Sequence, residues 1–237
     1  MTKNIFNAAM VLVGTAGLLT GCNFDQPEAP CFVQDSASWA TRYDPIDDPV
    51  DANGAGCELR APIAELVGVY KFSDPDDLSN SLLTLRPQGV ASIANRDPGP
   101  TTDQTALGRF DIEPDADEFC TAETLSVASV NAAATQTAPA TTISYEFSNI
   151  QVYAAPSTPG TQLRGQVKYT RNGCTSNYAI RSMWPAVACN PTNPNSCAEN
   201  PNVNPDFATE CLTVSTNPTT GAVTAYCVPS KPVPSFK

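Results

Sequence analysis

The chain has 237 residues, a formal net charge of −11 at pH 7 and no histidine. Its acidic balance argues against nucleic acid and anionic lipid as partners. The lack of histidine excludes Ser-His and Cys-His nucleophile pairs and every histidine metal site. No cofactor is expected.

The first 21 residues have the layout of a secretory signal. Lys3 gives a positive start, and residues 5–19 form an uncharged apolar run that is shorter than the ~20 residues needed to span a bilayer. Residues 19–22 (Leu-Thr-Gly-Cys) resemble the lipobox of bacterial lipoproteins. The alternative is a plain secreted protein in which Cys22 joins a disulfide.

The lipoprotein resemblance implies that Cys22 is acylated and becomes the first residue of the mature chain. Two or more acyl chains hold a protein firmly in a membrane, so the membrane is an expected partner through Cys22. Asn23 follows, where enteric lipoproteins retained in the inner membrane tend to have Asp. This favours an outer membrane lipoprotein, with its body facing either the periplasm or the cell surface.

Eight further cysteines in an oxidising compartment indicate four disulfides. Spacing alone cannot fix the pairings. A bridge between Cys31 and Cys57 is favoured because it would tie down the irregular loop between them, and Cys189 and Cys197 lie close enough in the chain for a local bridge. The eight cysteines are Cys31, Cys57, Cys120, Cys174, Cys189, Cys197, Cys211 and Cys227.

Residues 22–62 are expected to be the lipidated cysteine, a tether and an irregular acidic loop, because Pro and Asn-Gly interrupt them. Part of the loop resembles a calcium-binding EF-hand, but Pro49 and Arg60 occupy the first and last ligand positions. A solvated turn is preferred to a looser metal site formed by four carboxylates, which would be Asp44, Asp47, Asp48 and Asp51.

From residue 63 the pattern changes to short runs of alternating apolar residues, separated by turn residues. We expect strands at residues 66–72, 81–85, 90–94, 106–112, 119–130, 142–153, 163–170 and 177–184. The second and third should form a hairpin, a β-bulge is expected near Asn149, and Asn172-Gly173 indicates a hairpin turn. The pattern predicts an all-β fold, an antiparallel sandwich or barrel stapled by disulfides, with long Pro/Asn-rich loops.

The β domain is expected to span residues 63–228, followed by a tail at 229–237. It includes an Asn/Pro-rich loop at 189–207 and a C-terminal hairpin at 208–228. Folding this hairpin about Thr219 places Cys211 opposite Cys227, so a disulfide is expected between them. Elimination then pairs Cys120 with Cys174.

The residues Gly68-Val69-Tyr70, followed by Leu83-Thr84-Leu85 and Gln88-Gly89, resemble the opening of lipocalin-like barrels. Tyr70 stands where that family has a Trp. The resemblance implies a barrel that could hold a small apolar ligand. Its interior would be lined by Tyr70, Phe72, Tyr145, Phe147, Tyr169, Tyr178 and Trp184, although core packing is the simpler interpretation of these residues.

The preferred function is a non-catalytic binding or interaction module anchored to the envelope, with an envelope protein or a small apolar ligand as partner. The alternative is a structural or adhesive component in which residues 190–205 form a contact loop. A carboxylate-based hydrolase is a third hypothesis, because paired carboxylates can hydrolyse glycosides. Its candidates are Asp74, Asp76, Asp77, Asp111, Glu113, Asp115, Asp117 and Glu118, which all lie in turn-like contexts. We therefore expect no enzyme activity.

Overall fold

The computed structural model describes residues 30–73, 75–77, 80–99, 102–217 and 219–237. Two short helices in this part are α2 (Gln88–Ala91) and η1 (Ala94–Arg96). Its strands are β1 (Ser36–Pro45), β2 (Ala64–Ser73), β3 (Ser81–Pro87), β4 (Ala106–Phe110), β5 (Phe119–Thr124), β6 (Ala128–Ala132), β7 (Thr141–Tyr153), β8 (Gln162–Arg171), β9 (Cys174–Met183), β10 (Thr209–Thr216) and β11 (Val223–Pro229).

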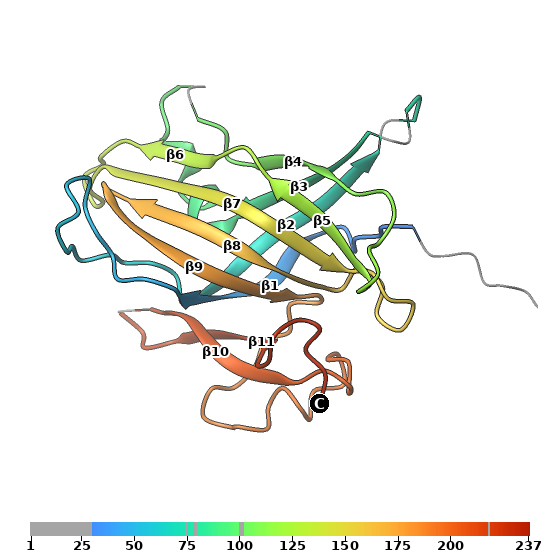
Figure 1. Cartoon of the computed structure of the whole chain (residues 1–237). Coiled ribbons are helices and arrows are strands. Elements are labelled where there is room, and N and C mark those ends of the chain that lie inside the picture. Colours follow the sequence, from blue (N-terminus) through green and yellow to red (C-terminus); the bar gives the residue numbers. More distant parts are fainter. Residues whose placement is uncertain (1–29, 74, 78–79, 100–101, 218) are drawn as a thin grey trace, which may run out of the picture.

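Nine of these strands form one antiparallel sheet that curls into a nearly closed barrel (Figure 1). The strand order is β4-β3-β2-β1-β9-β8-β7-β5, and β6 also pairs with β7. Most strands therefore pair with the next strand in the chain, as in an up-and-down barrel, and β1 pairs with β9, the last strand of the sheet in chain order. The all-β prediction is confirmed, and the architecture is a barrel.

The barrel closes along a seam between β4 and the segment that contains β5. No ladder joins the two, but the Asp111 amide donates to the Thr121 carbonyl at 3.1 Å and the Ser126 amide to the Leu107 carbonyl at 2.8 Å. Gly108 allows this close approach, because a Cβ there would lie 2.5 Å from the carbonyl oxygen of Thr124.

Large side chains fill the barrel interior. Trp39, Tyr145 and Tyr169 are all at most 2 % exposed. The ring of Tyr145 lies 4.9 Å from that of Tyr169 and 5.8 Å from that of Phe147. These residues alternate along their strands, so the inward face of each strand contributes to one continuous core.

Two local features were correctly predicted from the sequence. The register of β7 against β8 shifts between Ser148 and Gln151, and Asn149 has a positive φ of 49°, so the predicted bulge is confirmed. Asn172 and Gly173 both have positive φ and join β8 to β9, as the Asn-Gly pair indicated.

Two strand predictions were wrong. Residues 90–94 do not return along β3, because the chain turns into α2 and η1 and inserts Val90 into the core at the end of the barrel. The expected strand at 119–130 divides into β5 and β6, which pair with different parts of β7.

The expectation of an irregular segment through residues 22–62 was also wrong in part, because β1 lies there and occupies the centre of the sheet. Trp39, Thr41 and Tyr43 alternate along its buried face. Thr41 interrupts the apolar alternation by which a strand is predicted, since a polar residue is not expected inside a barrel. Its hydroxyl is satisfied by the hydroxyl of Ser182 on β9, at 2.7 Å.

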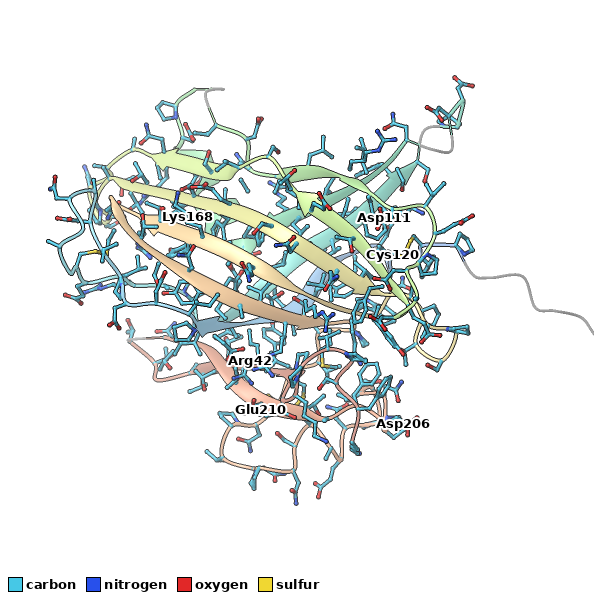
Figure 2. The ribbon with its side chains drawn as sticks, viewed as in Figure 1. Arg42, Asp111, Cys120, Lys168, Asp206 and Glu210 are labelled. Carbon is cyan, nitrogen blue, oxygen red and sulfur yellow. A yellow bond between two sulfur atoms is a disulfide. The ribbon has the colours of Figure 1, made fainter. Side chains whose placement is uncertain are left out.

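Strands β10 and β11 form a separate hairpin that packs on the outside of the barrel (Figure 1). Val228 joins Ala40 and Ala64 in a small apolar cluster between the two parts. Figure 2 shows Arg42 on the barrel pointing toward Glu210 on the hairpin, and these two side chains form an ion pair.

The Asn/Pro-rich loop at 189–207 consists largely of consecutive turns. The side-chain oxygen of each asparagine that precedes a proline accepts the amide two residues later, as in an Asx turn. The four amides donate at 3.0 or 3.1 Å and belong to Thr192, Asn195, Asn202 and Asp206.

All eight cysteines are paired, but every predicted pairing was wrong. The bonds are Cys31–Cys120, Cys57–Cys174, Cys189–Cys211 and Cys197–Cys227. The strand β1 separates Cys31 from Cys57, and at about 3.3 Å per residue it takes them to opposite ends of the barrel.

The C-terminal hairpin has the predicted register, because Cys211 lies opposite Cys227. However, the segment 187–189 hydrogen-bonds to β11, with the Cys189 amide donating to the Ala225 carbonyl at 3.1 Å. This segment lies beside the hairpin, so Cys211 bonds to Cys189, and Cys227 bonds to Cys197 from the same loop.

Candidate binding site at the barrel mouth

One end of the barrel contains a hollow of about 440 Å³, which we call the mouth. It lies where β8 ends, where β2 begins and where α2 and η1 fold over the barrel. Its base is formed by Glu65, Tyr145 and Tyr169 from the barrel interior, and its walls include Arg60, Arg96 and Arg171.

Glu65 is a buried carboxyl with three donors aimed at it. The hydroxyl of Tyr43 donates to Oε1 at 2.6 Å and the amide of Gly89 donates to Oε2 at 2.7 Å. The hydroxyl of Tyr145 also hydrogen-bonds to this carboxyl. Burial raises the pKa of Glu65, although these three hydrogen bonds oppose the shift.

The tyrosines around Glu65 are held in their protonated form. Burial, and then the nearby Glu65, raise the pKa of Tyr43 and of Tyr145 well above the usual value. Burial also raises the pKa of Tyr169, which the adjacent Arg171 opposes. The base of the mouth therefore presents hydroxyl groups.

Gly89 is required by this arrangement. A Cβ at that position would collide with the hydroxyl of Tyr145 and would lie 3.3 Å from Oε2 of Glu65. Because Gly89 has no side chain, its amide and the tyrosine hydroxyl can both reach the same carboxyl group.

The arginines of the mouth have few partners. Arg96 donates from Nη2 to the Pro139 carbonyl at 3.2 Å, and its buried Nε has no hydrogen-bond partner. Arg171 donates from Nη1 to the Arg60 carbonyl at 3.4 Å and also hydrogen-bonds to Tyr169. Among the described residues, no carboxylate forms a salt bridge with Arg96 or Arg171.

A second hollow of about 380 Å³ adjoins the mouth and shares Arg60 and Arg171 with it. Cys57 and Cys174 line this second hollow, and their disulfide connects the loop before β2 to the first residue of β9. The disulfide thus holds Arg60 near the end of β8, where Arg171 lies.

Three of the four aspartates considered as metal ligands have protein partners of their own. Asp44 forms ion pairs with Arg42 at 2.7 Å and Arg181 at 2.6 Å. Asp47 accepts the Asn177 amide at 2.7 Å, and this bond, followed by those from the Asn177 and Ser176 side chains, lowers its pKa.

Asp48 and Asp51 lie in the loop after β1. Asp51 closes a turn by accepting the amides of Asn53 and Ala55, both at 2.9 Å, and Asp48 is exposed. In the described part of the chain, the one group with ligand atoms close enough to share a metal ion is Cys189, Cys197 and Cys227, which are disulfide-bonded.

Three of the carboxylates considered for hydrolysis accept hydrogen bonds that hold the structure around β5. Asp111 accepts the Thr121 amide at 2.9 Å, Asp115 accepts the Phe119 amide at 2.8 Å and Glu118 accepts the Tyr153 hydroxyl at 3.0 Å. Asp74 lies outside the described residues.

The predicted aromatic lining of the barrel was correct in four positions, because Tyr145, Phe147, Tyr169 and Tyr178 are buried. It was wrong for β2, where Tyr70 is half-buried and Phe72 is 56 % exposed. The inward face of β2 instead contains Glu65, Val67 and Val69. Sequence reasoning missed Glu65, although its place in phase with the two valines was the available signal.

Comparison with known proteins places this barrel in a family. A family model described as MlpA matches residues 37–185, which extend from β1 to just beyond β9 and include the mouth. The chain belongs to the MlpA family. A Myxococcus xanthus protein named "Putative lipoprotein MlpA" is 51% identical over 241 residues, with complete coverage of both chains. No solved structure matches the chain.

The family supports the predicted identity of the chain as a bacterial lipoprotein anchored in the envelope. Cys22 lies outside the described residues, so its acylation stays a prediction, as does the likeness to lipocalins. Among the residues that the structure describes, no helix has the length and apolarity needed to cross a membrane.

Proposed function

We propose that this lipoprotein is a non-catalytic binding module of the outer membrane that takes a small polar molecule at the barrel mouth. The observation that carries the proposal is the mouth itself. It combines a hollow of about 440 Å³, protonated tyrosines at the base and arginines with unused donors in the walls. A few convergent polar groups in a concave site are typical of ligand pockets.

Two features favour this proposal over the other hypotheses. The barrel interior is filled by aromatic side chains, so a polar ligand at the mouth fits better than an apolar ligand inside. Glycoside hydrolysis by paired carboxylates needs two such groups. Glu65 is the one carboxylate among the described residues that line the mouth, and its oxygens already accept hydrogen bonds from the protein.

Binding can be tested by NMR on the full chain in a non-ionic detergent. Mixtures of anionic, neutral and cationic small molecules would be added while the side-chain signals of Tyr145, Tyr169 and the arginines are followed. We expect at least one mixture to shift these signals. Constant signals for all three mixtures would contradict the proposal.

The proposed outer membrane location can be tested separately. Metabolic labelling with palmitate should label the wild-type chain and leave Cys22→Ser unlabelled, and fractionation should recover the labelled chain with the outer membrane. Recovery of the chain in the inner membrane would contradict the interpretation of Asn23.

A contact with another envelope protein is a second candidate, favoured by the loop at 189–207. Its turns and two disulfides give this loop a fixed shape beside the hairpin (Figure 1). Cross-linking in whole cells from a probe at exposed Asn195 should capture a partner protein. The same cross-link pattern from a probe at exposed Glu123, on the barrel, would contradict a specific contact.

A further inference from the structure

We propose that the ligand of the barrel mouth carries an oxyanion, either a carboxylate or a phosphate, which Arg60, Arg96 and Arg171 bind together. This inference rests on the proposed function, because it names the chemical class of the molecule that the mouth would take. Its support is the charge of the mouth, the unused hydrogen-bond donors there and the position of the mouth in the fold.

The charge distribution is the first argument. The chain carries a net charge of −11, yet three of its eight arginines line this single hollow. Arg60 lies 4.0 Å from Glu58, but both side chains are more than 80 % exposed, so water screens that pair. Arg96 and Arg171 form no salt bridge with a described carboxylate. The mouth is therefore a positive site on an acidic protein.

Unused donors are the second argument. A guanidinium has five N–H groups in a planar fork that matches a carboxylate or a phosphate. Among the described residues, Arg96 donates to one acceptor and Arg171 to two. The buried Nε of Arg96 lacks a partner, which is uncommon for a buried donor. Most N–H groups of both side chains therefore make no hydrogen bond to a described residue, and those that are not enclosed are available to a ligand.

The remaining walls limit the rest of the ligand. Ile93, Ile143 and Pro139 give the hollow apolar sides, while Glu65 and Tyr145 at its base are already bonded to each other. A hollow of about 440 Å³ accommodates a small molecule. The geometry thus suits a small organic anion with a short apolar body.

The position of the mouth decides between a free anion and a lipid headgroup. The described chain begins near Cys31, whose disulfide to Cys120 lies at the end where β5 begins, and Figure 2 shows Cys120 at that end of the barrel. The mouth lies at the other end, where β8 finishes and β9 begins. A barrel tethered at its Cys31 end presents the mouth away from its own membrane, so a freely diffusing anion is the better occupant.

The test uses titration calorimetry and arginine side-chain NMR on the full chain in a non-ionic detergent. The probes are malonate, inorganic phosphate and malonamide, which is the neutral analogue of malonate. We expect malonate or phosphate to shift the Nε signals of Arg96 and Arg171, and malonamide to leave them unchanged. The anion that binds more tightly identifies the group as a carboxylate or a phosphate.

Variants then locate the contact. Charged hydrogen bonds are worth more than neutral ones, so we expect Arg171→Gln and Arg96→Gln each to weaken binding of the better anion about tenfold or more. Arg86→Gln is the matched control, because Arg86 is exposed on β3 and bonds to Gln104, outside the mouth. The affinity of Arg86→Gln for this anion should match that of the wild type, and the NMR spectra verify that each variant is folded.

Two results separate this inference from the proposed function. Malonamide binding as tightly as the anions, or anion binding unchanged in both mouth variants, would overturn the oxyanion assignment and leave a binding role standing. The oxyanion assignment would also be overturned, with the binding role intact, if neither anion binds while a neutral or cationic mixture shifts the mouth signals. If anionic, neutral and cationic mixtures all leave the mouth signals unchanged, the proposed function fails as well.

Discussion

Replacing Glu65 by alanine should strongly destabilise the barrel, because Glu65 is the shared acceptor for three buried donors. In Glu65→Ala the hydroxyls of Tyr43 and Tyr145 and the amide of Gly89 lose this acceptor. A buried donor left without a partner costs about 1–3 kcal/mol. Water in the adjoining mouth can satisfy some of them, so we expect a loss of roughly 3–6 kcal/mol in the free energy of unfolding.

The measurement is unfolding of the full chain in guanidinium chloride, followed by the fluorescence of Trp39 in the core and of Trp184, which packs against it. Glu146→Ala is a matched control on β7. Glu146 pairs with Lys168 at 2.9 Å on the outer face of the barrel, where both side chains are more than 40 % exposed. An exposed ion pair is worth about 0–1 kcal/mol, so this variant should lose no more than that.

The difference in unfolding free energy between the two variants tests whether the three donors depend on Glu65. If Glu65→Ala loses within about 1 kcal/mol of what Glu146→Ala loses, the three donors do not depend on Glu65 in the way described. The base of the mouth would then lack the fixed arrangement on which the binding proposal relies.

Three further predictions concern pH, the seam and a disulfide. Because burial raises the pKa of Glu65 in the folded chain, its stabilising effect is complete below the unfolded pKa and is lost as the pH rises through the folded pKa. The difference in unfolding free energy between the wild type and the non-titrating Glu65→Gln should therefore shrink from pH 4 to pH 8, and a constant difference would contradict the shift. Gly108→Ala should cost about 1–3 kcal/mol in the same unfolding assay, because the new methyl group would meet the opposite backbone across the seam; an unchanged stability would mean that the seam can widen freely. Replacing Cys57 and Cys174 by serine should lower the unfolding free energy by about 2–5 kcal/mol and weaken anion binding measured by calorimetry, since Arg60 loses its tether; unchanged affinity would show that the loop is held by other contacts.

The features predictable from the sequence were those set by a few neighbouring residues. Alternation of Ile143, Tyr145 and Phe147 predicted β7, and the change of phase after Asn149 predicted its bulge. The Asn172-Gly173 turn depends on positive φ at two adjacent residues, which Asn and Gly adopt readily. Such signals need no knowledge of the rest of the fold.

The features that sequence reasoning missed depend on distant partners. Thr41 is acceptable inside the barrel because Ser182, far along the chain, supplies a hydrogen bond, and this concealed the central strand β1. Because β1 was missed, a bridge between Cys31 and Cys57 was expected across an irregular loop, although the strand places the two cysteines at opposite ends of the barrel.

The mouth depends on distant partners in the same way. Glu65, Gly89 and Arg171 come from separate parts of the chain, and the closed sheet with α2 folded over its end brings them together. Apart from the alternation of Glu65 with Val67 and Val69, local patterns in the sequence therefore gave no sign of this site.

The seam between β4 and β5 has a consequence for how the barrel opens. Every other neighbouring pair in the cylinder is joined by a ladder, whereas isolated hydrogen bonds cross this line. Amide protons on either side of it should therefore exchange with solvent sooner than those between β7 and β8. Thermal fluctuations should therefore separate β4 from β5 first, while the strands that are joined by ladders, such as β7 and β8, stay paired.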